Sequence, residues 1–175
     1  DGTIMVLGVE NKDFFKVDFF KKWRILSQRL GAVQGVEQIV SIFSAQRLVK
    51  AKGEKKFIPE SLFKNEINSQ SQLDSLVEIY KLMPFYSGSL YNFETNTSFI
   101  AINIDDETLG SIKRMVLLEE VFALADEYLE PYGLEAKYSG LPYIRTSVAN
   151  SVKAEMKLFS ILSLIICAVI LLVFF

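Results

Sequence analysis

The spacing of hydrophobic and polar positions predicts a strand, a helix and a second strand in the first part of the chain. Thr3–Glu10 is rich in aliphatic and β-branched residues, which is typical of a strand. From Val17 to Val33, apolar residues recur every three or four positions and therefore share one face of a helix. Gly35 ends this helix, and Val36–Ser44 is predicted as the second strand.

The same order of elements returns in the second half. Ser98–Ile104 alternates as a strand, Ser111–Glu130 has helical periodicity, and Leu134–Ser139 alternates again. The buried face of the helix is expected to hold Ile112, Met115, Val116, Phe122, Ala125 and Leu129. Two strand–helix–strand units in series predict an α+β fold, a ferredoxin-like split βαβ sandwich. In that fold, two helices cover one face of a four-stranded antiparallel sheet.

Residues 45–97 separate the two units and are predicted to be an insertion, because they are too few to build a core of their own. A helix is expected over Gln70–Leu82, shortly before Pro84. Aromatic side chains then gather at Phe85, Tyr86, Tyr91 and Phe93. They either contact an apolar or amphipathic substrate in a groove, or they pack the insertion against the domain. The sequence leaves both interpretations open.

The C-terminal run Leu158–Phe175 has no charged residue and predicts a transmembrane helix. No proline or glycine occurs from Tyr143 onward, so residues 143–157 are expected to form an amphipathic connecting helix that continues into the span. The apolar stripe of this coupling helix is Ile144, Val148, Val152 and Met156. The folded domain is assigned to residues 1–142. Since the chain begins and ends in apolar segments, it is expected to be part of a longer protein.

The amino-acid composition limits which functions we expect of this chain. The net charge is −2, so the chain has no basic field and nucleic acid is not an expected partner. Histidine is absent, Cys167 lies in the apolar run, and no Gly-rich phosphate loop is present. We therefore expect no catalytic, cofactor-binding or metal site, and no enzymatic activity. The triplet 105–107 (Asp-Asp-Glu) is either a divalent cation site or, as we favour, a solvated helix start.

The order of these parts resembles the first extracytoplasmic loop of RND-superfamily transporters, in the branch of MMPL-type, hopanoid-exporter-type and Patched-like proteins. The resemblance is carried by Gly35-Val36-Glu37 with Ser41, by residues 138–142 (Tyr-Ser-Gly-Leu-Pro), and by the amphipathic helix that becomes apolar.

This resemblance implies a porter-type domain facing the periplasm and anchored in the bacterial inner membrane. It implies a proton-driven exporter of lipids or other hydrophobic molecules. The implied partners are the lipid bilayer, the rest of the transporter chain and a hydrophobic or amphipathic substrate, and the proton-relaying residues would lie outside this sequence.

Two other functions fit the same pattern. Membrane receptors and sensor kinases also place an extracytoplasmic α+β ligand-sensing domain directly before a membrane helix. A single-pass assembly or anchoring protein is the third possibility. The doubled strand–helix–strand order favours the transporter over the receptor.

Overall fold

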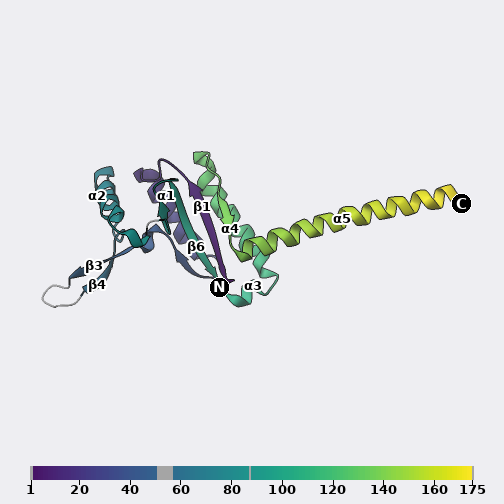
Figure 1. Ribbon diagram of the computed structural model, residues 1–175, viewed down its shortest axis with the longest axis horizontal. Coiled ribbons are helices and arrows are strands. Elements are labelled where there is room, and N and C mark those ends of the chain that lie inside the picture. The colour runs from purple at the N-terminus through teal and green to yellow at the C-terminus, as the bar shows by residue number, and fades with distance from the viewer. Residues whose placement is uncertain (1, 51–56, 87, 175) are drawn as a thin grey trace.

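The computed structural model describes residues 2–50, 57–86 and 88–174, which form a mixed α+β domain and one long C-terminal helix (Figure 1). The main sheet has the strand order β2-β6-β1-β7, and every neighbouring pair is antiparallel. The short strand β5 also pairs with β6, at the N-terminal end of β6. The strands are β1 (Ile4–Glu10), β2 (Val36–Val40), β5 (Tyr91–Asn92), β6 (Thr97–Ile104) and β7 (Lys137–Ser139).

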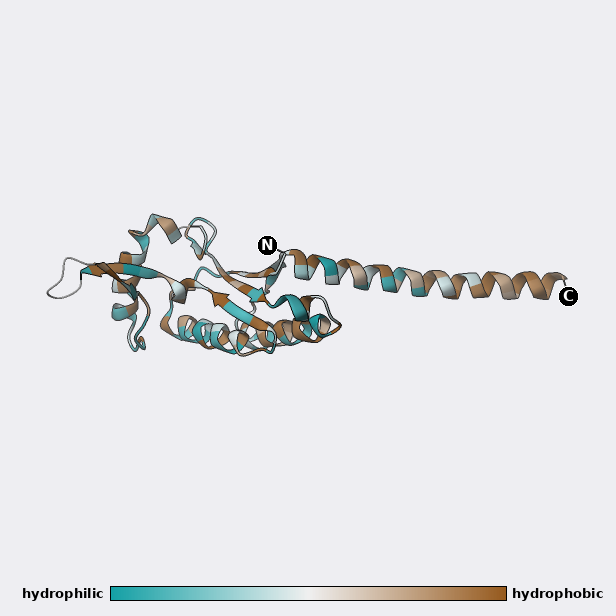
Figure 2. Cartoon of the chain, turned by 90° about the horizontal axis from the view of Figure 1, so that it is seen from below, coloured by the Kyte–Doolittle hydropathy of each residue, from teal (hydrophilic) through white to brown (hydrophobic). Residues whose placement is uncertain are grey.

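Helices α1 (Val17–Gly31) and α4 (Lys113–Leu129) contact each other and cover one face of this sheet (Figure 2). The core lies between the two layers, because alternate residues of β1 and β6 point toward the helices and are fully buried. These residues are Met5, Leu7, Val9, Ile100, Ile102 and Ile104. Trp23, Leu26 and Leu30 complete the core from α1, as the helical periodicity predicts.

The predicted buried face of α4 is only partly correct. Ala125 and Leu129 are buried, but Ile112 and Val116 are 84% and 64% exposed. The helix begins at Lys113, and its buried stripe runs through Leu117, Leu118 and Val121 instead. This helix has apolar residues on two faces, so periodicity alone selected the wrong one for its first two turns.

Several boundaries also differ from the prediction. The second strand ends at Val40 rather than Ser44, because residues 42–44 form a 3-10 turn closed by a capping box between Ser41 and Ser44. The last strand, β7, is shorter than Leu134–Ser139. A hairpin of β3 (Gln46–Lys50) and β4 (Phe57–Ser61) was not predicted, and its turn lies outside the described residues.

The segment between β2 and β6 carries this hairpin and helix α2 (Gln70–Lys81), which packs against the domain through Leu73, Val77 and Tyr80. Figure 1 shows the hairpin and α2 at the end of the molecule opposite to the C-terminus. Two polar side chains tie this segment to α1. Arg24 donates to the carbonyls of Phe63 and Asn65 at 2.9 and 3.1 Å, and Gln70 bonds to the Val17 amide and the Phe15 carbonyl.

Helix α5 (Leu141–Phe174) is one unbroken helix of 34 residues, two residues longer at its start than predicted. Only Pro142 and Thr146 are buried, Tyr143 is half-buried, and beyond Thr146 the helix projects away from the domain (Figures 1 and 2). The apolar part of α5 is long and hydrophobic enough to cross a membrane, and none of that part is buried in the domain. This observation supports membrane association, as the sequence predicts.

Gly140 makes the connection between β7 and α5 possible. Its φ angle is 109°, a region that only glycine adopts readily. A Cβ at this position would also collide with the carbonyl oxygen of Ile4 and would lie 3.0 Å from the Met5 Cα. The chain therefore turns from the sheet into the helix in direct contact with the backbone of β1.

Replacement of Gly140 by alanine should lower the free energy of unfolding by about 3 kcal/mol, since strained backbone and a steric clash add together. Gly133→Ala is the matched control, because Gly133 has a φ of 64° but no atom within 4 Å of an added Cβ. It should cost about 1 kcal/mol. Urea unfolding of the intact chain in mild detergent measures both, and equal losses would contradict the role given to the β1 contact.

Candidate functional site

The four aromatic residues predicted as substrate contacts do not share one environment. Phe85 is 83% exposed, Tyr86 and Phe93 are half-buried, and Tyr91 is only 2% exposed. Tyr91 packs with Phe14, Phe15 and Phe93 at ring-centroid distances of 4.7 to 5.0 Å. This arrangement favours packing for Tyr91 and leaves Phe85 as the member of the set whose ring is mostly open to solvent.

Tyr86 and Tyr80 extend this aromatic packing into the inserted segment. The Tyr86 hydroxyl accepts a hydrogen bond from the backbone N–H of Gln46 at 3.1 Å and donates one to the backbone carbonyl of Gln46 at 3.3 Å. It therefore binds the first residue of β3. Tyr80 stacks on Tyr86 with centroids 6.4 Å apart and also contacts Phe93. The rings of Tyr80, Tyr86, Tyr91 and Phe93 therefore hold the inserted segment and the domain together.

The predicted coupling stripe lies on the free part of α5. Ile144, Val148, Val152 and Met156 are 47% to 64% exposed, and α5 is buried only at its first turns. The stripe is thus available to another helix or to lipid, but it does not attach α5 to the sheet.

The attachment is made by three aromatic rings at the root of the helix. Phe122 of α4 contacts Tyr138 of β7 at 4.5 Å and Tyr143 of α5 at 6.1 Å, and the two tyrosines are 5.8 Å apart. The Tyr138 hydroxyl is buried and has no partner among the described residues, and this burial raises the pKa of Tyr138. The five-residue spacing of the two tyrosines around the Gly-Leu-Pro turn was the available sequence signal.

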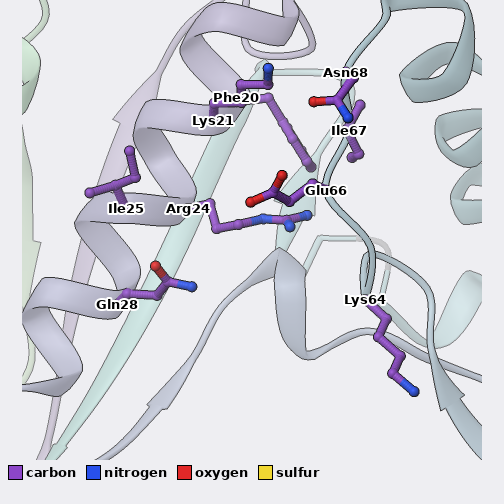
Figure 3. Close-up of a pocket in the computed structure, with 9 residues that line it drawn as sticks. All are labelled: Phe20, Lys21, Arg24, Ile25, Gln28, Lys64, Glu66, Ile67 and Asn68. Carbon is purple, nitrogen blue, oxygen red and sulfur yellow. The ribbon is translucent and has the colours of Figure 1, made fainter.

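We did not predict the groove beside α1 from the sequence; Figure 3 shows it in close-up. The groove has a volume of about 410 Å³ and separates α1 from residues 64–68. Arg24 extends across it to the carbonyls of Phe63 and Asn65, with its guanidinium 5.0 Å from the centre of the Phe43 ring. Lys21, Lys64 and Glu66 also line the groove; in Figure 3 the Glu66 side chain lies beside Arg24, and the Lys64 side chain points away from it.

A second hollow of about 350 Å³ continues the groove on the other side of Arg24. Gln28 and Lys64 line both hollows, and Ser27 lines the second. Desolvation lowers the pKa of Arg24, an effect that Glu66 partly opposes. The positions 24, 27 and 28 share one face of α1, and this polar patch beside an apolar stripe was the signal in the sequence.

The acidic triplet acts as a helix start, as favoured from the sequence. Asp105 caps α3 (Asp106–Leu109) by accepting from the Thr108 amide at 2.6 Å and from the Thr108 hydroxyl at 2.8 Å. These hydrogen bonds lower the pKa of Asp105. Within residues 2–50, 57–86 and 88–174, no cluster of three or more His, Cys, Asp or Glu side chains has the geometry of a metal site.

No protein-family model matches this chain, and no curated protein sequence matches it either.

Tyr91 and Phe85, the most buried and the most exposed of the four aromatic residues, should respond differently to truncation. Tyr91→Ala should cost about 3–5 kcal/mol of unfolding free energy, because it empties a packed aromatic site. Phe85→Ala should change the same quantity by less than about 0.5 kcal/mol, as at other exposed positions. Urea unfolding followed by tryptophan fluorescence distinguishes them, and a large loss for Phe85→Ala would show that it is packed.

Stability should also fall at alkaline pH. Burial raises the pKa of Tyr91 to about 12, and it raises the pKa of Tyr80 in the same direction. Tyrosine in the unfolded chain titrates near 10. The folded state therefore binds these protons more tightly, and the stability they contribute is complete below pH ~10 and lost as the pH rises toward ~12.

The free energy of unfolding, measured from pH 8 to 12, should decline above pH ~10. Tyr91→Phe should make this decline shallower, because one titrating group is removed while the ring is retained. An unchanged slope in Tyr91→Phe would show that Tyr91 does not contribute to it.

Proposed function

We propose that this chain is the extracytoplasmic porter-type domain, with the adjoining membrane helix, of a proton-driven RND-type exporter of lipids or other hydrophobic molecules. The observation that carries the proposal is the unbroken α5, which leaves the sheet at Gly140 and stays helical through its apolar end. Such a helix transmits tilt or translation from a membrane domain to the sheet without a flexible joint.

The positions of the domain's two connections support the proposal. Gly2 lies against Leu141 at the start of α5, where an added Cβ would be 3.4 Å from the leucine Cδ1. The N-terminus is therefore beside the root of α5 (Figure 1). A domain inserted between two neighbouring membrane spans needs this arrangement, because both connections must face the same bilayer.

The strand order supports the ferredoxin-like part of the proposal. Strand β6 lies between β1 and β2, and β1 lies between β6 and β7. Each strand–helix–strand unit is therefore split by a strand of the other unit, and this order supports the proposal of a split βαβ sandwich. The hairpin and α2 are inserted between the two units.

An extracytoplasmic sensing domain of a receptor is the second candidate. The groove around Arg24 favours it, since a cation-lined groove on the domain suits ligand detection. The rigid connection to α5 serves signalling as well as transport. Proton-dependent movement of a hydrophobic compound separates the two functions.

Insertion of Gly-Gly after Ala149 in the intact membrane protein should abolish most transport. Two flexible residues interrupt the helix where α5 has already left the domain, so the sheet would no longer follow the membrane helix. The measurement is efflux of a fluorescent hydrophobic dye from cells, with and without a protonophore.

Asn150→Ala is the control, since it changes the same exposed turn but keeps the helix. Both variants should retain the wild-type unfolding transition of the domain. Full efflux in the Gly-Gly variant would contradict the rigid-helix mechanism. Absence of any protonophore-sensitive efflux in the wild type would contradict the exporter itself.

A further inference from the structure

The groove between α1 and residues 64–68 contains hydrogen-bond donors that the protein does not use. Arg24 gives one N–H to each of two carbonyls, and its other N–H groups have no acceptor among the described residues. No carboxylate in this part of the chain lies within ion-pair distance of its guanidinium. A half-buried guanidinium in this state can accept a further anionic partner.

Ser27 gives a second and independent indication. It is 7% exposed, and its hydroxyl is buried without a hydrogen-bond partner among the described residues. A buried hydroxyl without a partner costs about 1–3 kcal/mol relative to a satisfied one. Ser27 lines the hollow of about 350 Å³ beside Arg24.

The charges around the groove select the sign of that group. Lys21, Arg24 and Lys64 are cationic, whereas Glu66 is the one acidic side chain lining the 410 Å³ hollow. Lysine and arginine offer donors only, so they match an acceptor-rich anion. Next to these charges the hollow has an apolar wall, formed by Phe20, Ile25 and Ile67.

We propose that this groove binds a ligand with an oxyanion group, a phosphate or a carboxylate, held by Arg24, Lys64 and Ser27, with an apolar portion lying along Phe20 and Ile25. The ligand is an amphiphilic anion if the apolar wall contributes, and a free oxyanion if it does not. The site does not depend on the exporter assignment, because it needs only the fold of α1 and the inserted segment.

The test uses the intact chain, ¹⁵N-labelled, in maltoside micelles at constant ionic strength. The probes are hexyl phosphate, hexanoate and inorganic phosphate, and the readout is the chemical shift of the Arg24 side chain and of backbone amides near Lys64. Saturable shifts at these positions are expected with hexyl phosphate. Tighter binding of hexyl phosphate than of inorganic phosphate assigns an amphiphile, and equal binding assigns a free oxyanion.

Two variants test the named contacts without removing Arg24, which also holds the fold together. Ser27→Ala and Lys64→Gln should each weaken hexyl phosphate binding about tenfold, as expected for loss of one strong hydrogen bond. Ser27→Ala should not lower the unfolding transition of the ligand-free protein, because no protein hydrogen bond is lost. This result separates a binding role from a structural one.

Lys22→Gln is the matched control for Lys64→Gln, since it also removes one lysine charge, at an exposed position of α1 that lines neither hollow. It should change the affinity less than twofold. Three results would overturn the proposal: no saturable shift with any probe, equal loss in Lys22→Gln and Lys64→Gln, or unchanged affinity in Ser27→Ala.

Discussion

The close backbone contact between Gly140 and Ile4 determines how the long helix is oriented on the sheet. Because β1 is a central strand, paired with β6 on one side and β7 on the other, α5 starts from the most constrained part of the domain. The Phe122, Tyr138 and Tyr143 rings add a second attachment one turn further along. Beyond Thr146 the helix is free of the domain, so these few contacts fix its direction.

The inserted segment is held in a different way. Polar side chains of Arg24 and Gln70 bind backbone groups, and aromatic rings run from Phe14 through Tyr91 and Phe93 to Tyr80. This attachment leaves two hollows along α1, one on each side of Arg24. The part of the molecule farthest from α5 is therefore the part best suited to binding, and the part nearest α5 is the part best suited to transmitting force.

Much of this architecture could be predicted from the sequence, because the signals were local and periodic. Helices α1 and α2 and the strands β1 and β6 each present one clear apolar face, and the absence of glycine and proline from residue 143 onward correctly indicated a continuous helix. The buried face of α4 was less predictable because Val116 and Leu117, adjacent in sequence, point to different faces and are equally apolar.

The candidate site was harder to predict from the sequence, for a physical reason. The groove lies between α1 and a segment about 40 residues later in the sequence. Only the tertiary fold brings the two together, through the hydrogen bonds of Arg24. Phe85 and Tyr91 have similar chemistry and lie six positions apart, yet one is on the surface and the other in the core. Side-chain type alone does not distinguish a ligand contact from a packing residue.

Helix α5 runs without a hinge from the domain through an apolar stretch that is long enough to cross a membrane. Spin labels introduced at Arg145 and Leu171, with Cys167 replaced by alanine, test it most directly in lipid nanodiscs. A continuous α5 predicts one narrow distribution of distances between the two labels at ~40 Å, the length of 26 residues of α-helix. If α5 crosses the bilayer, the label at 171 is accessible to oxygen dissolved in lipid. A broad or much shorter distribution, or a label at 171 accessible only to aqueous reagents, would contradict it.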